Sequence, residues 1–322
     1  MKTVTVVVPT YNEEENISQV VARLQALFAG ELSRYRLEIL FVDDGSTDGT
    51  VSLIRGYAEQ YPSQVKAILN ANNFGYVRNI FYGLQQAGGD CAILLHADLQ
   101  NPPELIPEFI RRWEAGCPIV IGIKNKSREK PALYFIRGIY YKLMARIAEV
   151  PHITHFTDFE LLDRSFLQVL RKIRDPYPYL RGIISEFGGS LERVYYTQEK
   201  RQRGKTKFRF WNNYDFAMLG ITSYTSRPIR LILLMGIFLL LCSGVGLASL
   251  LFYQLFCLKA FRFGALELAA LMGFFSSLQM LFLAILGEYI LSANRRAMLR
   301  PLVVERERLN FGDSAAGEQT DA

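Results

Sequence analysis

The sequence predicts an α/β fold with a parallel sheet, followed by two helices long enough to span a membrane. Short runs rich in β-branched residues alternate with stretches whose apolar residues recur at helical spacing, as in parallel βαβ units. Polar or acidic clusters follow three of these runs, where open parallel sheets bind ligands. Residues 231–256 and 266–291 each exceed the ~20 apolar residues that cross a bilayer.

The expected elements follow one another along the first half of the chain. Residues 3–8 form a continuous β-branched run, and the apolar residues between Ile17 and Phe28 then recur at helical spacing. Glu13, Glu14 and Glu15 would lie in the first turn of that helix, where carboxylates suit the positive end of the helix dipole. Further strands are expected at residues 37–42, 65–69, 91–95 and 119–123, with helices near residues 50–61 and 76–87.

One further helix is expected in the second half, and the chain as a whole divides into three parts. Residues 131–150 combine aromatic, aliphatic and basic residues, which fits either a helix at a membrane interface or a helix packed on the sheet. We expect a cytosolic domain with interfacial helices at residues 1–226, a transmembrane hairpin at 227–294, and a basic, then disordered, cytosolic tail at 295–322.

Charge and its distribution favour a membrane over nucleic acid as partner. The formal net charge is +6, and basic residues gather on both sides of the apolar hairpin. More arginines precede and follow the hairpin than lie in its short turn, so the positive-inside rule predicts that both termini are cytosolic. The chain begins without a signal-peptide pattern, so we expect an integral membrane protein whose catalytic domain stays in the cytosol.

Asp43 and Asp44 end the second strand. A turn alone would explain the Gly45–Ser46 and Asp48–Gly49 pairs, whereas two adjacent aspartates at a strand end are suited to binding a base or a ribose. No Gly-x-Gly-x-x-Gly motif follows the first strand and no Walker motif occurs, which disfavours a dinucleotide-binding or P-loop protein.

His96 and Asp98 follow the fourth strand. If the strand continued for two more residues, both side chains would point to the same side and could face one divalent ion. A carboxylate such as Asp98 suits Mg²⁺ or Mn²⁺ bridging a diphosphate. The alternative is a polar strand end followed by the Pro102–Pro103 turn and the start of a helix.

Several of these segments together resemble family 2 glycosyltransferases, in particular the branch that acts on polyprenyl phosphates. That branch includes dolichyl-phosphate mannose synthases and bacterial undecaprenyl-phosphate sugar transferases. The resemblance spans residues 3–305 and rests on residues 6–14 (VVVPTYNEE), 42–48 (VDDGSTD), 73–75 (NFG), 97–104 (ADLQNPPE) and 286–290 (LGEYI).

The resemblance implies a GT-A fold and an inverting transfer of sugar from a UDP- or GDP-linked donor to a polyprenyl phosphate, with Mg²⁺ or Mn²⁺ as cofactor, in a bacterial inner membrane. Tetramers occur in the family, so a homotetramer is a candidate assembly. Matching positions imply that the donor nucleotide is bound by Pro9, Tyr11, Glu13, Asp43 and Asp44. They imply metal and diphosphate binding by Asp98 and Gln100, with His96 as a further candidate ligand, and catalysis by Asp98 and Asp158. The acceptor phosphate would be bound by Arg181, Lys205 and Lys207.

Two positions depart from the family pattern. His96 stands where the family usually has Asp, so it is either a metal ligand or a hydrogen-bonding group outside the metal's own ligands. Glu160 stands where the family usually has Arg, which removes one expected phosphate contact. Two other functions stay open: a glycosyltransferase acting on a hydroxyl acceptor, for which Asp158 would be a true base, and a non-catalytic membrane assembly component.

Overall fold

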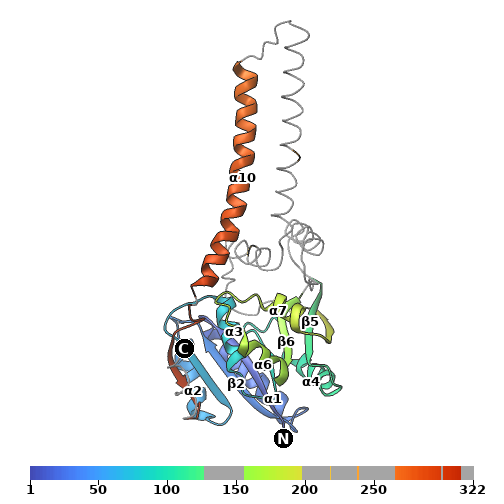
Figure 1. Ribbon diagram of the computed structural model, residues 1–322. Coiled ribbons are helices and arrows are strands. Elements are labelled where there is room, and N and C mark those ends of the chain that lie inside the picture. Colours follow the sequence, from blue (N-terminus) through green and yellow to red (C-terminus); the bar gives the residue numbers. More distant parts are fainter. Residues whose placement is uncertain (127–155, 198–217, 219–237, 239–264, 299, 313–322) are drawn as a thin grey trace, which may run out of the picture.

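The computed structural model describes residues 1–126, 156–197, 218, 238, 265–298 and 300–312 (Figure 1). The strands are β1 Thr3–Thr10, β2 Arg36–Asp43, β3 Val65–Asn70, β4 Cys91–Leu94, β5 Ile119–Lys126, β6 Phe156–Asp163, β7 Leu191–Thr197 and β8 Glu305–Leu309. The helices are α1 Glu14–Ala29, α2 Thr50–Gln60, α3 Tyr76–Gln86, the 3₁₀ turn η1 Pro103–Leu105, α4 Ile106–Glu114, α6 Arg164–Lys172, α7 Leu180–Phe187 and α10 Ala265–Ala297.

The strands form one mixed sheet in the order β7-β5-β6-β4-β1-β2-β3-β8. Strands β1 to β4 are mutually parallel, as the alternation of apolar runs and helical patterns predicts. Strand β6 runs antiparallel to both β4 and β5. Strand β8 is the outermost strand beside β3 and runs antiparallel to it. The carboxyl ends of β1, β2 and β4 therefore lie side by side at one edge of the sheet.

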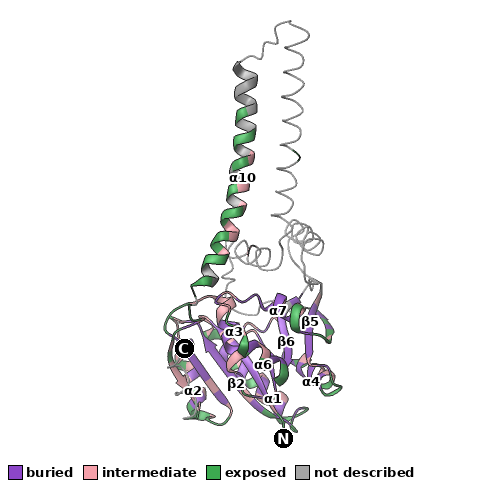
Figure 2. Ribbon diagram, in the orientation of Figure 1, coloured by how far each residue is buried: buried purple, intermediate pink, exposed green. Residues whose placement is uncertain are grey.

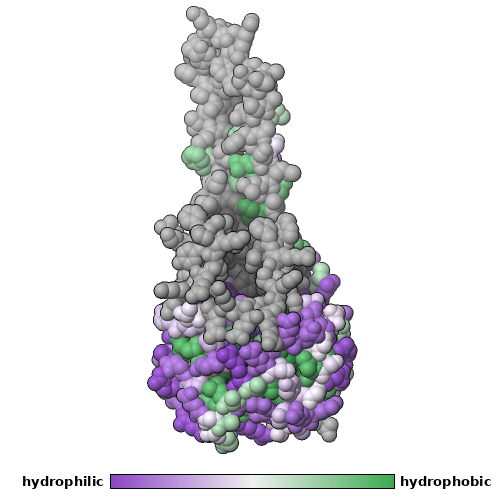
Figure 3. Space-filling model, turned by 180° about the vertical axis from the view of Figure 1, so that it is seen from behind, coloured by the Kyte–Doolittle hydropathy of each residue, from purple (hydrophilic) through white to green (hydrophobic). Residues whose placement is uncertain are grey.

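Two apolar clusters cover the two faces of the sheet, so the body has three layers. One cluster joins the sheet to α1, α2 and α4, and the other joins it to α3, α6 and α7. Figure 2 shows the strands largely buried between these helices. On the face seen in Figure 3, hydrophilic side chains cover much of the described body. The sheet is thus a rigid platform for the loops at its edge.

Helix α10 contains the second predicted span, whereas the first, residues 231–256, lies outside the described part of the chain apart from Phe238, as does the helix expected at 131–150. Helix α10 leads away from the sheet, and its described side chains are largely exposed or intermediate (Figures 1 and 2). Across the described ranges, no helix is both long and apolar enough to cross a membrane.

The prediction of an integral membrane protein in a bacterial inner membrane, with a cytosolic catalytic domain and cytosolic termini, is therefore contradicted. It rested on counting apolar residues and gave too little weight to the polar residues among them. Ser276, Gln279 and Glu288 place polar side chains along α10. Such groups are costly in hydrocarbon, where no water can solvate them.

Strand β8 follows α10 and returns the chain to the sheet (Figure 1). Ion pairs and hydrogen bonds fasten it to both helical layers. Glu307 pairs with Arg55 on α2, and Arg308 donates to the Tyr82 hydroxyl and the Gln86 amide oxygen on α3, both at 3.0 Å. Residues from the first and last hundred of the chain are thereby held together.

Candidate active site

The edge formed by the carboxyl ends of β1, β2 and β4 carries most of the predicted site residues. Pro9 lies within β1, Tyr11 and Glu13 follow it, and Asp43 is the last residue of β2. The loop after β1 is held against the loop after β2, because Asn12 accepts a hydrogen bond from the Thr47 amide at 2.7 Å and donates its own amide to Ser46 at 2.8 Å. Asn12 needs a positive φ of 51° to do this.

Asp43 is completely buried and holds its own loop. Its carboxylate accepts from the Ser46 amide at 2.9 Å and from the Thr10 hydroxyl at 3.1 Å. Gly45 makes this tight turn possible, since its φ is +73° and an added Cβ would lie 2.7 Å from the Asn72 carbonyl carbon. Asp43 therefore shapes the loop, as the turn interpretation predicts.

Asp44 fastens the loop after β3. Its carboxylate accepts from the backbone amides of Phe74 and Gly75, each at 2.9 Å, and from the Asn70 side chain at 3.2 Å. Burial raises the pKa of Asp44 and outweighs the opposing effect of these donors. The residue thus links β2 to the amino end of α3, and nucleotide binding by Asp43 and Asp44 stays a prediction.

The segment after β4 differs from its expected geometry. Strand β4 ends at Leu94, so the two-residue alternation that would point His96 and Asp98 the same way does not extend to them. Asp98 accepts from the Gln100 amide at 3.2 Å, in a turn where Leu99 has a φ of 53°. The His96 imidazole instead contacts the carbonyl oxygen of Asp158 at 3.1 Å.

A metal at this edge would need ligands from the substrate. In the part of the chain that the structure describes, no three His, Cys, Asp or Glu side chains come together to hold a metal ion. Asp98 is half-buried in the turn after β4, and a single carboxylate with phosphate oxygens and water can complete a Mg²⁺ site. The residues present fit a cation bound together with a diphosphate.

Asp158 lies at the centre of a buried polar cluster. Arg181 on α7 pairs with it through two hydrogen bonds, from Nε at 2.7 Å and from Nη2 at 2.9 Å. The Tyr76 hydroxyl donates to the same carboxylate at 3.0 Å. Burial opposes ionisation of Asp158, but the charge of Arg181 and its hydrogen bonds prevail and lower its pKa. Asp158 is therefore a stable carboxylate and a weak base.

The Asp158 backbone adopts a conformation that non-glycine residues rarely take. Its φ is 53°, and the pairing of β6 with β5 shifts register nearby, between Ile121 and Ile123. Such a conformation costs on the order of 1 kcal/mol and persists where the surroundings fix it, which is common at functional sites. Arg181 and Tyr76 supply contacts that fix it here.

Tyr76 is the site residue that the sequence analysis missed. It is the first residue of α3, and it stacks on the His96 ring with centroids 5.7 Å apart while its hydroxyl bonds to Asp158. Burial, then the Asp158 charge, raises its pKa well above 10, so the hydroxyl stays a hydrogen-bond donor. The only sequence signal is its position directly after the quoted Asn73–Gly75 segment.

Two of the predicted acceptor residues cannot be placed. Lys205 and Lys207 lie outside the described residues, so their role stays a prediction. Arg181 is described, and its guanidinium is engaged with Asp158, a contact that the sequence analysis did not anticipate.

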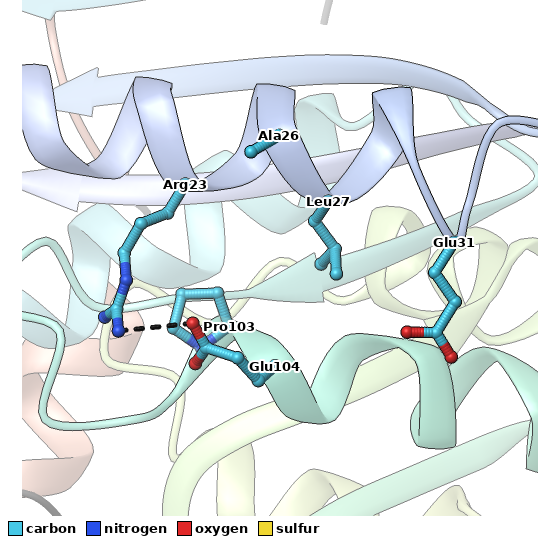
Figure 4. A pocket seen from close by; sticks show the side chains of 6 residues that line it. All are labelled: Arg23, Ala26, Leu27, Glu31, Pro103 and Glu104. Carbon is cyan, nitrogen blue, oxygen red and sulfur yellow. Dashed lines mark ion pairs between the residues drawn. The ribbon is translucent and has the colours of Figure 1, made fainter.

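A hollow of about 270 Å³ lies between α1 and η1 and contains none of the predicted site residues (Figure 4). Arg23 pairs with Glu104 across it at 3.2 Å, beside Leu27 and Pro103.

Comparison with known proteins identifies the family. Residues 5–171, more than half of the chain, match the model for glycosyl transferase family 2. The chain belongs to this family. The mixed sheet covered by helices on both faces is the GT-A-like fold that the resemblance implies, and this glycosyltransferase is an enzyme of the class predicted from its motifs.

Relatives of this family 2 glycosyltransferase match nearly its whole length. An uncharacterized glycosyltransferase, YkcC, of Bacillus subtilis (strain 168) is 31% identical over 306 residues, 93% of this chain and 92% of the relative. A prophage bactoprenol glucosyl transferase homolog of Escherichia coli (strain K12) is 31% identical, covering 89% of this chain and 93% of its own.

Solved structures are more distant from this family 2 glycosyltransferase. The mannosyltransferase PcManGT from Pyrobaculum calidifontis, in complex with GDP-Man and Mn²⁺, is 17% identical, with a TM-score of 0.46 over 91% of this chain and 86% of that one.

Proposed function

We propose that this enzyme transfers a sugar, with inversion, from a nucleotide-sugar donor to a polyprenyl phosphate. The observation that carries the proposal is the Asp158–Arg181 pair, in which both carboxylate oxygens already accept hydrogen bonds from Arg181 and Tyr76, an arrangement that suits an orienting group better than a base for a hydroxyl. A phosphate acceptor needs no such base, because its second pKa lies near ~6. The similarity to a bactoprenol glucosyl transferase homolog over 89% of the chain supports the same acceptor class.

The donor nucleotide would bind over the loops after β1 and β2. Asp43 holds the loop after β2 and Asp44 holds the neighbouring loop after β3, while Pro9, Tyr11 and Glu13 belong to the end of β1 and the loop that follows it. Loops anchored by buried carboxylates lose little conformational entropy on binding, which favours a preformed site.

Asp98 and Gln100 would hold a divalent cation, Mg²⁺ or Mn²⁺, against the donor diphosphate. Once bound, such a cation neutralises charge on the departing nucleoside diphosphate. The contacts of His96 with Tyr76 and Asp158 favour its role as a group that orients Asp158, and leave Asp98 as the charged candidate ligand.

In the proposed displacement, an acceptor phosphate oxygen forms a bond to the anomeric carbon as the bond from that carbon to the diphosphate breaks. The electron pair of the broken bond leaves with the nucleoside diphosphate, and no proton has to be removed from an ionised acceptor. Asp158 would orient the sugar or the acceptor, and Arg181, with Lys205 and Lys207, would bind the acceptor phosphate.

Acceptor competition tests this proposal. Purified full-length enzyme is supplied with a radiolabelled nucleotide sugar, Mg²⁺ or Mn²⁺, and either polyprenyl phosphate or the corresponding polyprenol. We expect labelled lipid only with the phosphate, and an Asp98→Asn variant that folds but loses metal-dependent transfer. Transfer to the polyprenol would favour the hydroxyl acceptor, and failure to turn over any donor would favour the non-catalytic role.

A further inference from the structure

Glu160 is a buried carboxyl group to which the proposed mechanism assigns no role. It lies in β6, between β4 and β5, and is paired in register with Ile121. None of its surface is exposed, and among the described residues neither carboxyl oxygen has a hydrogen-bond partner. A buried polar group without a partner costs free energy, so its retention calls for an explanation.

The charged neighbours of Glu160 belong to the candidate active site. Asp158, two residues earlier on the same strand, and Arg181 on α7 are the two groups that act on its ionisation. Tyr76 on α3 feels its charge as well, and His96 at the end of β4 contacts Asp158 and Tyr76. Glu160 is thus part of the same electrostatic cluster.

Within the Asp158–Arg181 pair the charges already balance with Glu160 neutral. Asp158 and Arg181 cancel one another through their paired hydrogen bonds. Burial, then repulsion by Asp158, raises the pKa of Glu160 well above its usual value, and the attraction of Arg181 is too weak to reverse this. An ionised Glu160 would add a negative charge beside the pair that Arg181 already neutralises.

We propose that Glu160 is a specificity-determining residue that acts as a neutral acid: because it carries no charge, the Asp158–Arg181 cluster can receive an acceptor that is itself an anion. This inference rests on the proposed function, since it concerns the acceptor phosphate. A negative charge on Glu160 would repel a phosphate bound at Arg181, because charge interactions are strong in a medium of low dielectric. Neither Asp43 nor Asp44 is among the charges that act on Glu160, so we expect a smaller effect on the donor.

The protonation state can be measured directly. Wild-type enzyme at neutral pH should show the infrared carbonyl band of a protonated carboxyl group, and the Glu160→Gln variant should lack it. Glu160→Gln keeps the shape and the neutrality of the side chain, and Glu160→Met provides a second neutral variant should the first fail to fold. Glu186→Gln, which removes an exposed carboxylate from the helix that carries Arg181, is the matched control.

Kinetics then test the effect on the acceptor. The KM values for polyprenyl phosphate and for the nucleotide sugar are measured from about pH 6 to about pH 10, a range that spans ionisation of a carboxyl group with a strongly raised pKa. We expect the wild-type KM for the acceptor to rise about tenfold or more at the alkaline end, with the donor KM changing little. Both neutral Glu160 variants should remove this rise, and Glu186→Gln should retain it.

The outcomes separate the two proposals. A missing infrared band, a flat wild-type profile, or Glu160→Gln with the same alkaline rise as wild type would overturn the role of Glu160 and leave the proposed function standing. A folded Glu160→Gln that is inactive at every pH would do the same, because the carboxyl group itself would then be required. Wild-type enzyme that transfers sugar only to a neutral acceptor would overturn both.

Discussion

At the residue scale, the site depends on how a few buried charges compensate one another. Asp158 is 5% exposed and Asp44 is 3% exposed. Burial decides the direction of the pKa shift only for Asp44, because Asp158 has the positive charge of Arg181 beside it and Asp44 has no such partner. Backbone amides stabilise Asp44 without neutralising it. The same residue type thus has its pKa moved in opposite directions by its partners.

Removal of Arg181 should leave Asp158 as an unpaired buried charge. We expect Arg181→Met to lower the free energy of unfolding by about 3 kcal/mol at neutral pH, and Asp158→Asn in the same chain to restore part of that loss. The pKa of Asp158 is lowered in the folded state. The stabilisation that the Asp158–Arg181 pair gives the wild type should therefore be complete above about pH 4 and vanish as the pH falls through that lowered pKa. Denaturant titrations at several pH values measure this.

Arg164→Met is the matched control for that cycle. Arg164 pairs with Asp90 at 3.7 Å, and both side chains are substantially exposed. Exposed pairs contribute less than about 1 kcal/mol, so this variant should stay close to wild type. Equal losses from the two arginine substitutions would show that burial of the Asp158 pair has no special effect.

At the element scale, strand ends determine the shape of the site more than strand interiors do. The apolar runs predict β1 to β4 well, because strands buried on both faces consist of almost continuous apolar residues. The end of β4 at Leu94 was not predictable, since Leu95 is equally apolar. Beyond that end the strand alternation no longer applies, and His96 contacts Tyr76 and Asp158.

Gly75 at the start of α3 should matter for the donor site. Its φ is +94° and an added Cβ would meet no atom within 4 Å, so Gly75→Ala strains only the backbone, by about 1–2 kcal/mol. The strained residue carries the backbone amide that donates a hydrogen bond to the Asp44 carboxylate. We therefore expect a weaker affinity for the nucleotide sugar, measured by calorimetry.

Gly116, between α4 and β5, has a φ of +99° and equally open surroundings, which makes Gly116→Ala a control with the same strain away from the loops. It should lose similar stability and keep its donor affinity. If both variants bind the donor as wild type does, the Asp44–Gly75 contact has no part in donor binding.

At the scale of the whole molecule, contacts between residues far apart in the sequence complete the fold, and the sequence pattern does not predict them. Strand β8 reads Glu-Arg-Glu-Arg-Leu, and its lack of alternating apolar residues gives no strand signal. Its charged side chains find partners more than two hundred residues away, such as Arg55 and Tyr82. The family motifs likewise indicated Asp158 but gave no sign of its pairing with Arg181, because that contact depends on the packing of α7.

Arg308 should be the main attachment of β8 to α3. Burial, then the hydrogen bond to Glu305, raises the pKa of Tyr82 to about 12, so its hydroxyl stays protonated beside Arg308. Arg308→Met should cost about 1–3 kcal/mol and speed hydrogen exchange of the β3 and β8 amides. Arg306→Met, on the same strand but exposed, should do neither. Similar exchange rates in both variants would contradict this role.

The position of β8 also has a consequence for biosynthesis. A nascent chain emerges from the ribosome in order, so β3 is made long before its edge partner, which comes only after α10. Until then the polar backbone groups along one side of β3 have no neighbouring strand, a state that invites pairing between chains. Chaperone demand for this enzyme should therefore persist until β8 has been made, however early its catalytic loops have formed.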